Sequence, residues 1–172
     1  GVISDSTGKG LTTSGSGRLL LSAANTFTGI FTAGGGTDAG EVVVLNNGAL
    51  GDQGSSNVTS TVVAGNQATI ALVLDGSRTG GVTIANELFD MRNRTTAAPE
   101  LISRNGNNTW AGSMMLTGTN SGQHAYGVAV EAGASLTIGG DVYTNASGQT
   151  YRDLTLIGAG NSKPTQVSIT IA

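Results

Sequence analysis

Short runs of alternating apolar and polar residues recur along this chain of 172 residues. Leu19 and Leu21, for example, would lie on one face of an extended strand, and the residues beside them on the other face. Gly, Asn, Ser and Thr separate the runs, and no segment keeps the period of an amphipathic helix. The pattern predicts strands at residues 19–21, 41–45, 58–63, 70–74, 82–84, 114–117, 127–130, 135–138, 154–157 and 167–171.

Two segments that lie far apart share a corner motif. Residues 25–29 and residues 108–112 both have the form Asn-Thr-aromatic-x-Gly, and a new strand follows each of them. Amide and hydroxyl side chains satisfy backbone groups where a chain bends. Repetition of strands and corners favours a solenoid over a sandwich or a barrel. The structural corner residues that we predict are Asn25, Thr26, Thr28, Gly29, Asn108, Thr109 and Gly112.

The segment around the first corner resembles a known repeat. Residues 15–29 are similar to the autotransporter-associated β-strand repeat, a motif of long bacterial cell-surface proteins. Residues 42–51 (VVVLNNGALG) resemble the strand and the Asn-x-x-Ala-Leu-Gly turn of that family, and residues 132–140 and 154–160 resemble its later windings. The chain departs from the family at Ala23, Phe27 and residues 30–31, where the family usually has Gly, Tyr and Gly-Thr.

The resemblance implies an all-β fold, a right-handed parallel β-helix in which each repeat forms one winding. At roughly 20 residues per winding and ~4.8 Å per step, the chain would form about eight windings over roughly 40 Å. Residues 33–40 and part of 87–104 are expected to form loops or side excursions. Eight residues are expected to face a common interior: Leu19, Leu21, Val42, Val44, Leu136, Ile138, Leu154 and Leu156.

The two ends of the sequence would continue one strand pattern. Val167, Ile169 and Ile171 alternate up to the last residue, and Gly1 and Ile3 would follow in phase. We therefore expect residues 1–172 to be a single module of a longer repetitive protein or fibre. Its copies would join head to tail, either covalently or by stacking.

Composition excludes several classes of function. With 38 % hydrophobic residues and a net charge of −3, the chain can bury a core, and it has no basic stripe for nucleic acid. The absence of cysteine excludes disulfides and thiolate metal sites. No apolar run is long enough for a membrane-spanning helix.

The residues that could support catalysis are few and scattered. His124 is the only histidine, it lacks a Gly-x-Ser-x-Gly partner motif, and we expect it to lie exposed in a loop. Glu87 and Asp90 are the closest acidic pair, and beside Arg92 and Arg94 they are expected to form a surface ion-pair group. We therefore predict no catalytic residue, no bound metal and no cofactor.

These observations favour a structural, non-catalytic segment of an exported bacterial surface protein, stalk or extracellular fibre. The expected location is extracellular or at the cell surface, and the expected partners are other copies or repeats of the chain. An alternative is an adhesin whose side loops bind a glycan or host ligand. A third reading is a β-helix enzyme that acts on polysaccharides, which would need carboxylates brought together by stacking.

Overall fold

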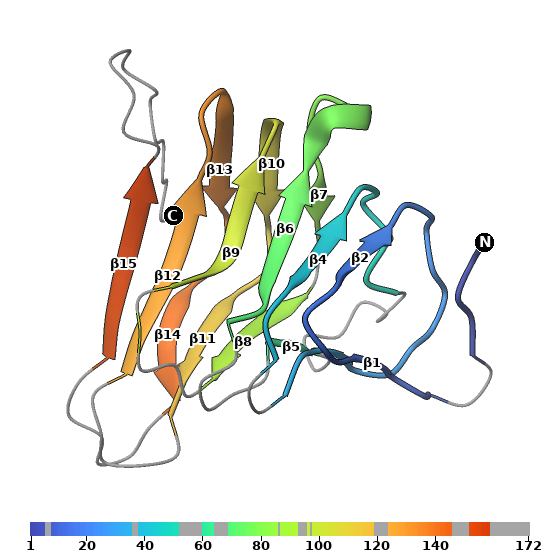
Figure 1. Ribbon diagram of the computed structural model, residues 1–172, viewed down its shortest axis with the longest axis horizontal. Coiled ribbons are helices and arrows are strands. Elements are labelled where there is room, and N and C mark those ends of the chain that lie inside the picture. Colours follow the sequence, from blue (N-terminus) through green and yellow to red (C-terminus); the bar gives the residue numbers. More distant parts are fainter. Residues whose placement is uncertain are drawn as a thin grey trace.

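In the computed structural model the chain forms a parallel β-solenoid that winds through three sheets (Figure 1). All strand pairings among the residues that the structure describes are parallel, and each joins strands of neighbouring windings. The all-β class and the parallel solenoid are therefore confirmed. The structure describes residues 1–5, 8–35, 38–51, 60–63, 69–85, 87–92, 96, 98–118, 124–145 and 152–158.

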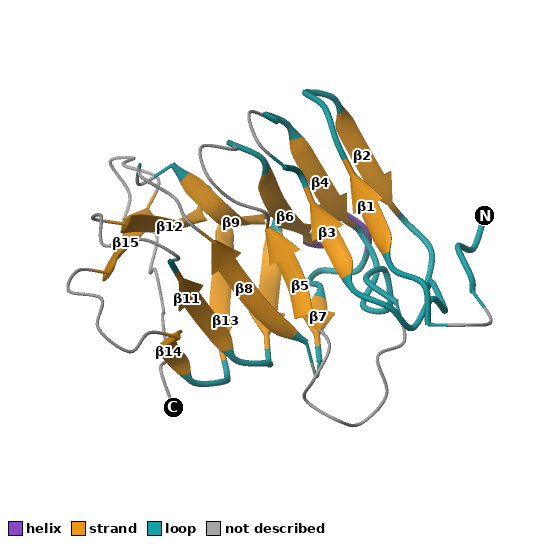
Figure 2. Cartoon of the chain, turned by 90° about the horizontal axis from the view of Figure 1, so that it is seen from below, coloured by secondary structure: helices purple, strands orange, loops and turns teal. Residues whose placement is uncertain are grey.

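Among the described residues, two sheets have six strands each and the third has three. Figure 1 shows sheet 2 face on, and Figure 2 shows sheet 1 from below. Sheet 1 contains β1 (Leu11–Thr13), β3 (Phe31–Ala33), β5 (Ser60–Val63), β8 (Leu88–Arg92), β11 (Met114–Thr117) and β14 (Val142–Asn145). Sheet 2 contains β2 (Arg18–Leu21), β4 (Glu41–Val44), β6 (Ala71–Asp75), β9 (Pro99–Arg104), β12 (His124–Val130) and β15 (Arg152–Gly158). Sheet 3 contains β7 (Thr83–Ile84), β10 (Gly106–Trp110) and β13 (Ala134–Ile138), and one 3₁₀ turn, η1, covers Gly76–Arg78.

The windings are longer than expected. Glu41 pairs with Ala71, 30 positions later, and Leu101 pairs with Val128, 27 positions later. Three windings carry a strand in every sheet: β5 to β7, β8 to β10 and β11 to β13. The expected number of eight windings is not confirmed. Leu11 pairs with Phe31, 20 positions later, but most windings use more residues than the roughly 20 that were assumed.

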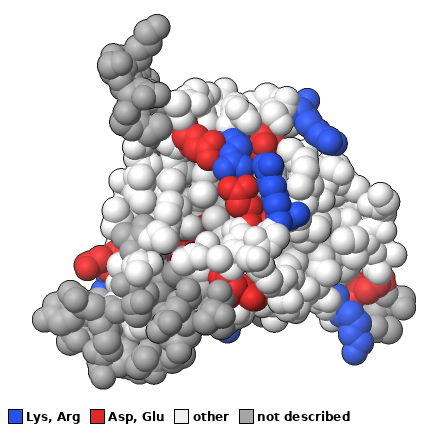
Figure 3. All heavy atoms as spheres, in the orientation of Figure 1, with Lys and Arg blue, Asp and Glu red and all other residues white. Residues whose placement is uncertain are grey.

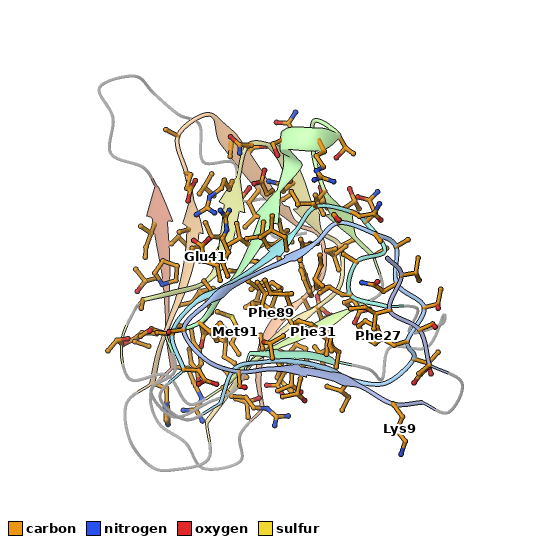
Figure 4. The ribbon with its side chains drawn as sticks, turned by 45° about the vertical axis from the view of Figure 1, so that its right-hand side comes forward. Lys9, Phe27, Phe31, Glu41, Phe89 and Met91 are labelled. Carbon is orange, nitrogen blue, oxygen red and sulfur yellow. The ribbon has the colours of Figure 1, made fainter. Side chains whose placement is uncertain are left out.

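Apolar side chains form columns inside the coil. In sheet 2 the register aligns Val42, Leu72, Leu101 and Val128, and all four are buried in the central core. Figure 4 shows aromatic and methionine side chains from other strands pointing into the same interior. Because every winding supplies residues to these columns, each winding buries its apolar face only against its neighbours.

Of the eight residues expected in the interior, those near the middle of the solenoid are buried and most of those at its two ends are more exposed. Leu21, Val42, Val44, Leu136 and Ile138 are buried, and Leu154 is partly buried against the core. Leu19 and Leu156 belong to the same column as Val42 and Val128, yet their exposed fractions are 36 % and 46 %. They are exposed because they lie on the outermost strands of sheet 2.

The expected side excursions are partly wrong. Most of residues 87–104 lies in β8 and β9, which are inner strands of the two large sheets. The charged residues there suggested a loop, but Asp90 and Glu100 lie buried within β8 and β9. The turn after β3 is closed by Asp38, whose carboxylate accepts from the Gly35 N–H at 2.9 Å. The strand expected at residues 167–171 lies outside the described residues.

We predict that Leu136→Asp destabilises the fold by several kcal/mol, measured by urea unfolding. Leu136 is fully buried in β13, so the substitution places a carboxylate in the core without a partner. Leu156→Asp, in an inward column but at an exposed end, is the matched control and should cost less than about 1 kcal/mol. Equal effects of the two variants would contradict the assignment of the interior.

Candidate functional site

Asn25 and Asn108 link successive windings through their side-chain amides. Both are buried. The Oδ1 atom of Asn25 accepts from the Ile3 N–H at 2.9 Å, and its Nδ2 donates to the Ala49 carbonyl at 2.6 Å. The Oδ1 atom of Asn108 accepts from the Val82 N–H at 2.8 Å. Asn25 lies between strands as predicted, whereas Asn108 and Thr109 lie inside β10 rather than at a corner. The Nδ2 atom of Asn108 nevertheless donates to the Arg104 and Asn105 carbonyls in the turn before β10, at 3.2 and 3.0 Å.

The two corners occupy equivalent places in their windings. The backbone N–H of Thr26 donates to the Ile3 carbonyl, and that of Thr109 donates to the Val82 carbonyl, at 2.9 and 2.8 Å. Ile3 and Val82 therefore occupy equivalent positions, each accepting a backbone hydrogen bond from the threonine of one motif. The hydrogen bonds repeat although the windings differ in length.

Aromatic rings and glycines complete both corners. Phe27 packs on Phe31, and Trp110 packs on Phe89, with ring centroids 6.4 and 5.1 Å apart. A Cβ on Gly112 would overlap the Glu87 carbonyl oxygen, and a Cβ on Gly29 would overlap backbone atoms of the preceding winding. Thr28 donates from its N–H and its hydroxyl to the Asp5 carboxylate, at 3.2 and 3.3 Å. At the second corner Ala111 replaces Thr28.

The prediction that His124 is an exposed loop residue is wrong. It is the first residue of β12, and 2 % of it is exposed. Its ring centroid lies 6.4 Å from that of Tyr126, whose hydroxyl donates to the Thr117 carbonyl at 2.8 Å. His124 alternates with Tyr126 and Val128, so it shares their inward face. The Gly, Asn and Ser residues before His124 suggested a loop, so the prediction placed the start of this strand too late.

Glu87 and Asp90 do not form the expected surface group. Their exposed fractions are 5 % and 1 %, although the Asp90 carboxylate pairs with the Arg92 guanidinium at 2.6 Å as their proximity in sequence suggested. Burial raises the pKa of the Glu87 carboxyl to about 8. Arg94 lies outside the described residues. Which side of a strand is covered by other parts of the chain cannot be read from local sequence.

A row of four charged residues crosses the outer face of sheet 2 (Figure 3). Arg104 donates to Glu131 at 2.8 Å and to Glu41 at 2.9 Å, and Arg18 lies 3.2 Å from Glu41. The hydrogen bonds from Arg104 lower the pKa of the Glu41 carboxyl, and its two carboxylate partners raise the pKa of Arg104. No local pattern in the sequence indicated this row, because 63 positions separate Glu41 from Arg104.

Two features of the described residues bear on the binding of ions and small molecules. No group of three or more His, Asp or Glu side chains among them could hold a metal ion. A cavity of about 160 Å³ lies at the β1/β2 end, below the ~300–1,000 Å³ of typical ligand pockets. Across all the described residues, no helix is long and apolar enough to cross a membrane. The cavity is lined by Thr13, Ser14, Gly15, Gly17, Arg18, Leu19, Glu41, Val42 and Ile70.

Exposed large apolar side chains gather at the ends of the solenoid. None occurs between residues 31 and 142 among the described residues. Five lie within the first 30 residues and two lie in the winding of β14 and β15. Contiguous exposed apolar surface marks sites of association. The residues are Val2, Ile3, Leu19, Leu20, Ile30, Tyr143 and Leu156.

Comparisons with known proteins add no relative: no family model, no curated protein and no solved structure matches the chain significantly. The similarity of residues 15–29 to a surface-protein repeat therefore stays a prediction from sequence. A function for this chain must be inferred from the geometry of its corners, its charged row and its ends.

We predict that Asn108→Ala lowers the free energy of unfolding by about 1–3 kcal/mol, because the Val82 N–H is left buried without an acceptor. Asn107→Ala is the matched control. Asn107 is exposed and only accepts from the Ser135 hydroxyl, so its loss should change stability by less than about 0.5 kcal/mol. Urea unfolding followed by circular dichroism measures both, and a larger loss from the Asn107 variant would contradict the role of the corner amide.

Glu87→Gln should remove a pH dependence of stability. A carboxyl with a folded pKa of about 8 and an unfolded pKa of 4.5 binds more protons when folded, so stability falls as pH rises from 4.5 to 8. The variant should match the original protein at pH 4 and exceed it at pH 9 by up to about 5 kcal/mol, since each pKa unit between 4.5 and 8 is worth ~1.4 kcal/mol. Asp153→Asn, at an exposed position, serves as the control, and an unchanged pH profile in the Glu87 variant would refute the expectation.

Proposed function

We propose that this protein is a structural, non-catalytic β-solenoid segment of an exported bacterial surface protein, stalk or extracellular fibre. One observation carries the proposal: the described exposed large apolar side chains lie in the windings at the two ends of the stack. Along the sides, polar and charged groups are engaged within the fold, as in the row from Arg18 to Glu131. Such a molecule is suited to extend along its axis rather than to hold a substrate on its flank.

The direction of the coil and the location of the protein are parts of the same proposal. Parallel strands joined by crossovers favour a right-handed path, which is the hand we propose here. Export to the cell surface is supported by the resemblance of residues 15–29 and 42–51 to the surface-protein repeat. The proposed partners along the axis are other copies or repeats of the same chain.

An enzymatic role has less support from the geometry. His124 is buried on the inward face of β12, and the Asp90 carboxylate is paired with Arg92. Glycosidases need two carboxyl groups that flank an accessible sugar. Of the acidic residues considered as candidates, Glu87 and Asp90 are both buried.

Two measurements test the proposal. Antibodies raised against the purified chain should label the outside of intact cells of the organism that encodes it, and permeabilised cells should gain little extra signal. Pectin- and alginate-like polymers incubated with the protein should release no sugar beyond the level of a heat-denatured control. Labelling confined to permeabilised cells, or sugar release that is lost in His124→Ala while the variant stays folded, would contradict the proposal.

A further inference from the structure

The outermost strands of sheet 2 match each other residue by residue. Leu19 and Leu20 of β2 pair with Val42 and Val43, while Leu156 and Ile157 of β15 pair with Val128 and Ala129. A second copy placed with its β2 beside β15 would set its Leu19 over Leu156. The same placement sets Leu20 over Ile157 on the outer face, so apolar residues meet on both faces.

The outermost strands of sheet 1 match in the same way. Leu11 pairs with Phe31, and Val142 pairs with Met114, so both stand in the same inward column. Placing β1 of a second copy beside β14 aligns Leu11 with Val142. Two positions further along, Thr13 meets Thr144, which permits a hydroxyl ladder. A second copy stacked in this way can therefore continue both large sheets in the register that each sheet already has.

Charge favours the same arrangement. Asp153 lies exposed on the outer face of β15, and Arg18 lies on the outer face of β2 with half of its side chain exposed. In the register that aligns Leu19 with Leu156, Arg18 and Asp153 are diagonal neighbours on one face. Pairing of like ends instead would place two Arg18 side chains, or two Asp153 side chains, at one junction.

We infer that the β1/β2 end of one copy binds the β14/β15 end of a second copy, with Leu19 of one aligned with Leu156 of the other. The contact continues both large sheets by parallel hydrogen bonds and buries apolar residues that are exposed in one copy. Because the two faces differ, the contact is heterologous and leaves a free end on each side, so it builds a chain of copies. This inference rests on the proposed axial role and names the surfaces that carry it.

Two single substitutions test the inference. Leu19→Lys blocks one end and Leu156→Lys blocks the other, and both sites are exposed enough to leave the fold intact. Each variant alone should lose self-association by more than about 100-fold, because a lysine faces an apolar partner at every junction. Mixed in equal amounts they should form a dimer of twice the 17.1 kDa monomer mass, joined through the two unaltered faces. Sedimentation measures the masses, and the unaltered protein should form longer chains.

The controls separate this contact from other modes of association. Thr83→Lys, an exposed change on the flank, should assemble like the unaltered protein. Because the chain has no cysteine, Thr12→Cys and Tyr143→Cys on separate copies should cross-link with each other and not with themselves. A monomeric unaltered protein, a variant that still assembles alone, or a mixture that stays monomeric would overturn the inference. None of these results would alter surface labelling or the absence of sugar release, so the proposed function is tested separately.

Discussion

Parallel hydrogen bonding between successive windings is the constraint on which the rest of this structure depends. Each strand must lie in register with the strand one winding away, so residues 20 to 30 positions apart are brought into columns. Inward columns collect Val, Leu and aromatic side chains, and on the outward face of sheet 2 Val43 and Val73 form a second, smaller buried cluster beside the charged row. The core is therefore long and narrow, and its stability comes from contacts between neighbours rather than from any one winding.

The corners and the flank solve the problems that this stacking creates. Backbone groups near the turns lack strand partners, and the amides of Asn25, between strands, and Asn108, inside β10, bind such groups across neighbouring windings. On the flank, Arg104 of β9 binds Glu41 of β4 and Glu131, the residue after β12. Partly buried charges with several partners help to keep the strands in register.

Within the described part of the chain, the outermost strands at the two ends lack this parallel hydrogen bonding on one side. Leu19 and Leu156 belong to a column whose central members are buried. Both are exposed because, among the described residues, no further strand pairs with theirs. A neighbouring copy supplies the missing strands most simply when it continues the columns. The axial assembly that we propose would use only these exposed edge strands and would need no additional binding site.

The sequence alone determined the class of the fold, because strand alternation and the repeated Asn-Thr-aromatic-x-Gly corners are local patterns. It identified Asn25 and Asn108, since an amide beside a turn has a local meaning. It did not determine the length of a winding, the burial of His124 and Glu87, or the pairing of Arg104 with Glu41. Those features depend on which residues, tens of positions apart, come to lie side by side. Only the register of the stacked strands decides which residues become neighbours, because that register depends on the number of residues in every turn between two paired strands.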